Sequence, residues 1–519
     1  MILWFASLAA LCIGGALLPR GRLPSLTPLA VAVFGYAAWL LVTNLWVNPY
    51  TSAASYDAAF LLAGFLIGRK ADRHGWATLF AVALAFGIAL AVWSIGQRLL
   101  GVEARGRALF ETPATLAATL NLLLAPALVL AAMGKRGPWF LAALVLLAGG
   151  IVGTASRGGW LALGAAALVA AVLFRRAGLR PERKDLAVVI LVLLGGYVLS
   201  LIQPLSWDTA VGTVARSGAA RLELYQAALA ALRDSSLVTG SGYLDFRYVL
   251  EAARPTIDSY RGGITYFVHN DYLQVLLELG LPGLGLLLLL AVLPAAQCWR
   301  ELPRLTPERR VLAIAFTAAA ASMAVHAMVD FPFYIAACLF LYGAAAGGLC
   351  AIAGGQREPA GRESITRIAK AAVAAGVFWV LLKPVAAEAA AEYARQKWRA
   401  NDGQTAAHWF EVARRVESKD WRFHWYAGQF WFVQAQAGNN AVAARFADRA
   451  FAAGIAANPR VVENHLWRIS THVYLRTLLP EPASKETLRQ WADRAQSLAP
   501  LDPGVKVQRD LLSRFEAKP

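Results

Sequence analysis

The chain has 519 residues, of which 58% are hydrophobic, and a formal net charge of +17. Its mean hydropathy is +0.48, and near-charge-free runs of about 18 to 25 residues recur, each long enough for a helix to cross about 30 Å of hydrocarbon. These features exclude an ordinary soluble enzyme. The cations lie in short loops between apolar runs, which argues against a nucleic-acid-binding protein.

The apolar runs predict an all-α, polytopic membrane protein with about 12 transmembrane helices. The helices are expected near residues 2–18, 28–46, 56–68, 76–100, 115–133, 139–153, 160–174, 186–203, 272–296, 311–329, 333–353 and 368–385. The third and the sixth runs are shorter than a comfortable membrane span. No basic segment precedes the first run and no clear cleavage site follows it, so we expect a membrane helix there and not a signal peptide.

Clusters of Arg and Lys occupy alternate loops of this predicted bundle. They include Arg69 and Lys70, Arg175 and Arg176, and Arg309 and Arg310. The positive-inside rule assigns these loops to the cytoplasm. The other loops and all residues after 385 are then expected outside. The four cysteines lie in or beside apolar runs, which predicts neither a disulfide framework nor a Cys-based zinc site.

The short outer loops contain few ionisable residues. They are Glu103, Arg105, Arg107, Glu111, Arg157, His326 and Asp330. Arg157 lies between two apolar helices with no carboxylate nearby in sequence, and glycines follow it. A bound phosphate would compensate its charge, because guanidinium groups match phosphate oxygens. The alternative is that Arg157 extends to the lipid headgroups.

The largest outer loop covers residues 204–271. It carries six arginines: Arg216, Arg221, Arg233, Arg247, Arg254 and Arg261. Arg221 begins a stretch with helical periodicity, and the N-terminus of a helix favours anions. Leu237 to Tyr243 reads as a turn, and its two glycines match no nucleotide-binding pattern.

His269 closes this loop, with Asn270 and Asp271 beside it, where the next apolar run begins. Its ordinary pKa near 6.5 suits proton abstraction at neutral pH, which favours a general base. The alternative is a capping residue at the start of the helix. The outer loops lack the His and carboxylate clusters that ligate metals, so no metal site is predicted.

Residues 386–519 form a polar, Trp-rich tail that we expect to be a separate helical domain. An aromatic residue precedes Ala by four positions at Trp409, Phe446 and Trp491, each time before a polar or Pro-bearing turn. The separations of 37 and 45 residues are near the 34-residue tetratricopeptide period. We interpret the tail as degenerate, TPR-like helix hairpins that bind a protein partner or a glycan. An ordinary helical bundle is the alternative.

Several of these motifs together resemble the O-antigen ligase and polymerase superfamily, which includes protein O-oligosaccharyltransferases. The resemblance is carried by Ser156-Arg157-Gly158, Arg221, Gly240-Ser241-Gly242 with Phe246, His269 to Gln274, Glu278-Leu279-Gly280 and Gly283. His326 and Asp330 resemble a further motif at the outer end of the helices. Arg105 to Pro113 is similar to another loop of the family, although Pro113-Ala114 replaces the usual Pro-Asn.

The resemblance implies a GT-C type glycosyltransferase of the bacterial inner membrane. The transmembrane domain would be residues 1–385, the periplasmic tail residues 386–519, and the donor a glycan on undecaprenyl diphosphate. The transfer is expected to be inverting, with no metal or other cofactor. The acceptor stays open between lipid A-core, a growing polysaccharide and a protein hydroxyl.

The hypothesis that joins both lines of reasoning gives each residue a role. Arg157 and Arg221 bind the diphosphate as the glycosyl bond breaks, and His269 takes the proton of the acceptor hydroxyl. The residues expected to bind substrate are Arg105, Arg107, Asn270, Asp271, Tyr272, His326 and Asp330. Either Asp271 or Asp330 would orient His269. Two rival functions are a transporter of lipid-linked glycans or small molecules and a scaffold that recruits other enzymes through its tail.

Overall fold

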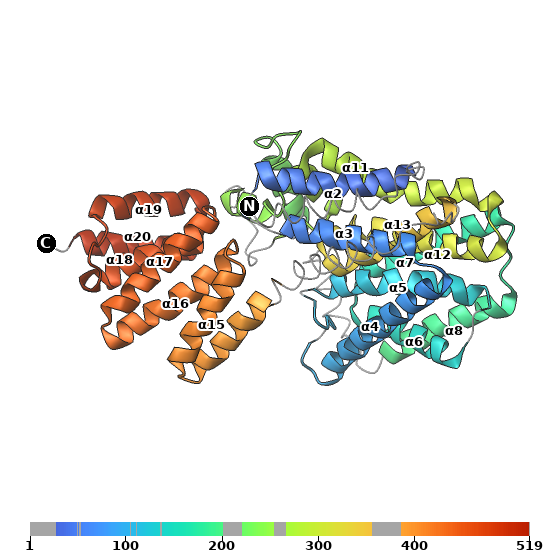
Figure 1. Cartoon of the computed structure of the whole chain (residues 1–519), viewed down its shortest axis with the longest axis horizontal. Helices are drawn as coiled ribbons and strands as arrows, with labels where there is room; N and C mark the ends of the chain where they lie inside the picture. The colour runs from blue at the N-terminus through green and yellow to red at the C-terminus, as the bar shows by residue number, and fades with distance from the viewer. Residues whose placement is uncertain are drawn as a thin grey trace, which may run out of the picture.

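The computed structural model describes residues 27–48, 50, 53–103, 105–110, 112–134, 137–200, 221–253, 266–354, 383 and 386–517. Throughout these ranges the fold is helical, and an isolated bridge between Ser236 and Gly240 is the one strand-like pairing. Figure 1 shows a bundle built from α2 to α13 and, beside one end of it, the helices α15 to α20.

The apolar helices of the bundle coincide with the predicted runs. They are α2 (Pro28–Trp46), α3 (Ala53–Lys70), α4 (Arg73–Leu99), α5 (Pro113–Ala132), α6 (Pro138–Gly153), α7 (Arg157–Ala177), α8 (Arg183–Ser200), α11 (Asp271–Glu301), α12 (Pro307–His326) and α13 (Ala336–Gly354). Thr27 and Thr112 cap α2 and α5, each followed by a proline in the first turn, where its missing N–H costs no hydrogen bond. The runs predicted at 2–18 and 368–385 lie outside the described residues.

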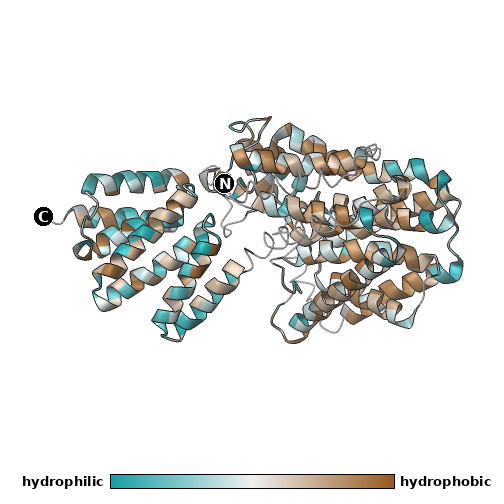
Figure 2. Cartoon of the chain, in the orientation of Figure 1, coloured by the Kyte–Doolittle hydropathy of each residue, from teal (hydrophilic) through white to brown (hydrophobic). Residues whose placement is uncertain are grey.

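Among the described helices, 6 are long and apolar enough to cross a membrane. They are Pro28–Trp46, His74–Leu99, Pro113–Ala132, Arg157–Ala177, Asp271–Arg304 and Ala336–Ala353. Figure 2 shows the hydrophobic residues concentrated on the bundle, whereas the tail is mostly hydrophilic. The prediction of a polytopic helical membrane protein is therefore confirmed, while the total of about 12 spans stays a prediction.

Close packing of α3 against α13 depends on glycines of both helices. A Cβ atom at Gly64 would lie 2.1 Å from the carbonyl oxygen of Phe340, and one at Gly347 would lie 2.1 Å from that of Phe65. Small residues at four-residue spacing are typical of packed membrane helices, because they let the backbones approach each other.

The large loop is anchored where α11 is broken. Gly280 has φ 69° and ψ −170°, which interrupts the helix. The amides of Ser241 and Gly242 donate to the carbonyls of Leu277 and Glu278 at 2.9 Å, and that of Leu281 donates to Leu237 at 2.8 Å. The turn predicted at residues 237–243 thus satisfies the backbone groups that the break leaves free.

Two helices of the large loop are described. One is described over residues 221–231, and the other is α10 (Phe246–Ala253). Arg216, Arg254 and Arg261 lie outside the described residues.

The tail consists of successive helices. They are residues 386–399, α15 (Gly403–Val416), α16 (Trp421–Gly438), α17 (Ala441–Ala457), α18 (Val462–Tyr474), α19 (Lys485–Leu498) and α20 (Pro503–Glu516). The three aromatic and Ala pairs lie on the alternate helices α15, α17 and α19, with Ala413, Ala450 and Ala495 buried. This alternation agrees with helix hairpins, and the assignment to TPR-like repeats stays a prediction.

The two ends of the bundle differ in charge. At one end Arg310 donates to the carbonyl of Ala177 at 3.0 Å, and Arg176 lies 5.0 Å from the ring centroid of Trp299. We call it the cationic end. The residues that begin α7 and α11 and end α12 meet at the opposite end, which we call the site end. Tyr56 donates to Glu417 at 2.7 Å, so the tail also contacts the site end.

Candidate active site

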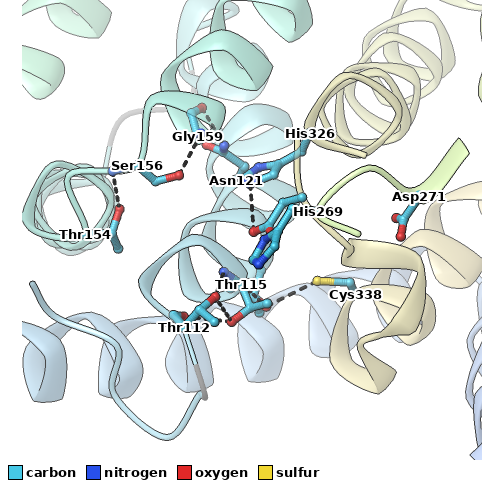
Figure 3. Close-up of polar contacts among 12 residues, drawn as sticks. Thr112, Thr115, Asn121, Thr154, Ser156, Gly159, His269, Asp271, His326 and Cys338 are labelled. Atoms are coloured by element: carbon cyan, nitrogen blue, oxygen red, sulfur yellow. Dashed lines mark hydrogen bonds and ion pairs between the residues drawn. The ribbon is translucent and has the colours of Figure 1, made fainter. Parts of the chain in front are cut away.

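His269 and Asp330 form the centre of the candidate site. His269 Nδ1 lies 3.0 Å from Asp330 Oδ1, and His326 Nε2 lies 3.7 Å from Asp330 Oδ2. Asp330 and His326 are each 1% exposed, whereas the side chain of His269 is 25% exposed. Figure 3 shows the two histidines side by side, with Asp271 apart from both. The partly exposed imidazole of His269 is therefore hydrogen-bonded to the buried carboxylate of Asp330.

Asp330 is ionised at every physiological pH. Burial opposes its charge, but the hydrogen bond with His269 and the proximity of His326 outweigh burial and hold the pKa of Asp330 at about 2. A carboxylate only accepts hydrogen bonds, so Nδ1 of His269 must donate. In the neutral ring the lone pair is then on Nε2, the nitrogen that a base would use.

The backbone at His269 is held in an unusual conformation. Its φ is 59°, in the left-handed region that non-glycine residues rarely adopt. Its carbonyl accepts from the Tyr225 hydroxyl at 3.1 Å, while the amide of Val268 donates to Gln274 Oε1 at 2.9 Å. The amide of Asp271 donates to the carbonyl of Ala327 at 2.8 Å. These contacts stabilise a strained conformation, which is frequent at functional sites.

Three guanidinium groups approach this pair. Arg105 donates to the carbonyls of Thr154 and Ala155 at 2.9 and 3.3 Å. Burial lowers the pKa of Arg105, and the charges of Arg221 and Arg157 lower it further, while Asp330 opposes them. The three arginines and Asp330 are thus within electrostatic reach of each other.

Arg157 begins α7, and Arg221 lies in the helix described over residues 221–231. Arg157 is exposed and Arg221 is half-buried, and no described carboxylate forms an ion pair with either. Converging guanidinium groups favour the binding of an anion, and at Arg157 the N-terminus of α7 attracts it as well.

The residues beside Arg157 explain its position. Ser156 Oγ accepts from the amide of Gly159 at 3.1 Å and so caps α7. A Cβ atom at Gly158 would lie 2.7 Å from Val329 and 3.3 Å from His326 Nε2. The missing side chain therefore lets the start of α7 pack against the loop that carries Asp330.

Other residues expected to bind substrate make contacts within the protein. Arg107 pairs with Glu103 at 2.8 Å, and the Tyr272 hydroxyl donates to the carbonyl of Ala324 at 2.8 Å. Asn270 Oδ1 caps α11 by accepting from the amide of Leu273 at 3.1 Å. Their roles toward substrate stay predictions, and Glu111 lies outside the described residues.

Asp271 and Asp330 are now distinguishable. Asp271 is fully buried, and its Oδ2 accepts from the amide of Phe333 at 2.8 Å. Asp330 contacts His269 directly. Of the two carboxylates, Asp330 is therefore the one placed to orient His269.

Three residues to which the sequence gave no role support the site. Tyr225 holds the carbonyl of His269, and Gln274 holds the amide of Val268. Glu278 accepts from the amides of Leu244 and Phe246 and from the Tyr334 hydroxyl, at 2.9, 3.1 and 2.7 Å. A signal for Gln274 and Glu278 existed, because polar residues four apart share one face of an otherwise apolar helix.

Comparison with known proteins found a family model that matches part of the chain. Residues 142–288 match the family model described as O-antigen ligase. No curated protein matched the chain. The matched region runs from α6 into α11 and contains Arg157, Arg221 and His269, whereas Arg105, His326 and Asp330 lie outside it. The chain therefore carries the domain of the O-antigen ligase superfamily over residues 142–288, as its motifs indicated.

Proposed function

We propose that the protein transfers a glycan from undecaprenyl diphosphate to an acceptor hydroxyl. One observation carries the proposal: a His269–Asp330 pair and the arginines 105, 157 and 221 converge at one end of an apolar helical bundle. A lipid-linked donor suits this position, because its polyprenyl chain would lie in the bilayer while its diphosphate reaches the guanidinium groups.

The arginines act on the leaving group. As the bond between the anomeric carbon and the diphosphate oxygen breaks, negative charge grows on the diphosphate. The positive charges of the guanidinium groups stabilise this charge and lower the barrier, and Arg105 is held for this by the carbonyls of Thr154 and Ala155. The diphosphate leaves as an anion, so the reaction needs no carboxylic acid to protonate it.

His269 acts on the acceptor. Its Nε2 takes the proton of the acceptor hydroxyl while the hydroxyl oxygen bonds to the anomeric carbon on the face opposite the diphosphate. A single displacement inverts that carbon. Asp330 fixes the ring through Nδ1 and stabilises the imidazolium that forms.

The compartment follows from the two ends of the bundle. The positive-inside rule assigns the cationic end to the cytoplasm of a bacterial inner membrane. The site end and the tail would then face the periplasm, where the acceptor is lipid A-core, a growing polysaccharide or a protein. Mass analysis of surface glycans and proteins in a deletion strain distinguishes these three acceptors.

The proposal is tested with purified protein in a lipid bilayer, an undecaprenyl diphosphate glycan and a candidate acceptor. We expect His269→Ala and Arg221→Ala to lower transfer by at least about 100-fold, because each removes a group that acts in the transition state. Exposed His408 of α15 provides the matched control, and His408→Ala should leave transfer unchanged.

Transfer is also expected to survive a metal chelator. Full activity of both site variants would remove the proposed roles, and an absolute need for an added divalent ion would contradict the mechanism.

A further inference from the structure

The tail and the large loop contact each other through two ion pairs of opposite polarity. Arg247 of α10 forms an ion pair with Glu463 of α18, and Asp245 pairs with Arg460. In one pair the loop contributes the cation, and in the other it contributes the anion. Asn458 donates to the Tyr248 hydroxyl at 2.8 Å. Crossed charge pairs of this kind fix one orientation of two surfaces, because sliding brings like charges together.

Arg247 also contacts the segment that leads to His269. Its side chain is 6% exposed, donates to the Tyr266 hydroxyl and lies 4.8 Å from the centroid of the Tyr266 ring. It lies 5.4 Å from the ring centroid of Trp421 in the tail. Arg247 is therefore held between the tail and a residue that precedes His269 by three positions.

The contacts continue from Tyr266 toward the imidazole. Gln274 of α11 donates to the carbonyl of Tyr266 at 3.3 Å and accepts from the amide of Val268 at 2.9 Å. The next residue is His269, with its left-handed backbone. Such a conformation persists only when the surroundings hold it, so support on the Tyr266 side affects where the ring meets Asp330.

We propose that Glu463 of the tail is a positioning residue for His269 and acts through Arg247 and Tyr266. The inference rests on the proposed function, because it takes His269 as the base. Without Glu463, the buried Arg247 loses its charge partner and is expected to move toward water, which releases Tyr266. The tail would then be part of the catalytic unit as well as a surface for partners.

Glu463→Gln tests the proposal, because the amide keeps the shape of the side chain and removes its charge. We expect kcat to fall about tenfold with an unchanged KM for the lipid donor, because the arginines are untouched. Glu463→Asp, which keeps the charge, should retain most of the turnover. The matched control is Glu486→Gln in the first turn of α19, where the carboxylate is 68% exposed.

Hydrogen exchange measures the coupling without any substrate. The amides of Val268 and Asp271 are expected to exchange several-fold faster in Glu463→Gln and at the wild-type rate in Glu486→Gln. Unchanged exchange at these amides, or faster exchange with wild-type turnover, would overturn the positioning role. The proposed function fails separately, if His269→Ala retains transfer, and the exchange result still decides whether the tail holds residues 266–271.

Discussion

His269 owes its predicted chemistry to Asp330. A histidine in water can carry its proton on either nitrogen, and the ring can rotate freely. The buried carboxylate selects the tautomer with the proton on Nδ1 and directs Nε2 away from Asp330. His326, 1% exposed and 3.7 Å from the second carboxylate oxygen, adds a neighbour that favours ionised Asp330. The side chain of the proposed base is thus oriented by a residue 61 positions away in sequence.

Asp330→Asn keeps the size of the side chain and removes its charge. We expect kcat to fall by at least about 100-fold, because the amide can no longer fix the tautomer of His269. The measurement is the rate of glycan transfer with saturating donor. Transfer close to the wild-type rate would show that Asp330 does not orient the base.

The same substitution has a defined effect on stability. Folding lowers the pKa of Asp330 from 3.8 to about 2, so its carboxylate stabilises the folded protein fully above about pH 4. This contribution is lost as the pH falls toward 2. The difference in unfolding free energy between wild type and Asp330→Asn should therefore shrink between these pH values in detergent solution. A difference independent of pH would contradict the lowered pKa.

The ends of three helices and the break in α11 at Gly280 determine the position of the site. α7 begins at Arg157, α11 begins beside His269 and α12 ends at His326, so their termini bring the candidate residues to one surface. The break at Gly280 lets the turn at residues 237–242 bond to α11. That turn leads directly to α10, so the break also determines where the loop meets the tail.

Gly280→Ala tests this anchor. A Cβ atom there would lie 2.4 Å from the carbonyl oxygen of Val238, at a φ of 69° that alanine adopts with strain. We expect a loss of about 1 to 3 kcal/mol of stability, measured by thermal unfolding in detergent. Gly285 of the same helix has no atom within 4 Å of its Cβ position, so Gly285→Ala is the control. Equal unfolding temperatures would show that the break is not required.

Across the whole molecule, charge and contacts agree on one arrangement. The arginines of the cationic end lie at one end of the bundle, while the candidate site and the tail contacts lie at the other. The proposed lipid-linked donor would then enter from the bilayer and react on the side where the tail is present. This separation suits an enzyme that works at the surface opposite the cytoplasm.

Cysteine labelling in intact spheroplasts tests the orientation. A membrane-impermeant thiol reagent should label Glu486→Cys in the tail and not Arg180→Cys at the cationic end, because only the tail is expected outside. Both positions are exposed, and the described native cysteines, Cys298, Cys338 and Cys350, are buried. Permeabilised cells should label both variants. The reverse pattern would place the site in the cytoplasm.

Hydropathy and local motifs were sufficient to predict the apolar helices that the structure describes and to name the residues of the candidate site. A helix long enough to span a bilayer is specified by the side chains within it, so runs such as 28–46 and 115–133 can be predicted without knowing their neighbours. Arg157, Arg221 and His269 stand out because a charged or titratable residue beside an apolar run needs a reason.

The partnerships among these residues depended on how the helices pack. By sequence, Asp271 and Asp330 are equivalent candidates for orienting His269. Only the packing of α11 against α12 brings Asp330 to His269, while Asp271 accepts a hydrogen bond from the amide of Phe333. Arg105 approaches Arg157 and Arg221 from other parts of the chain, and Glu463 reaches Arg247 across 216 positions. Local patterns report which side chains avoid lipid, whereas distances between remote residues are set by tertiary contacts.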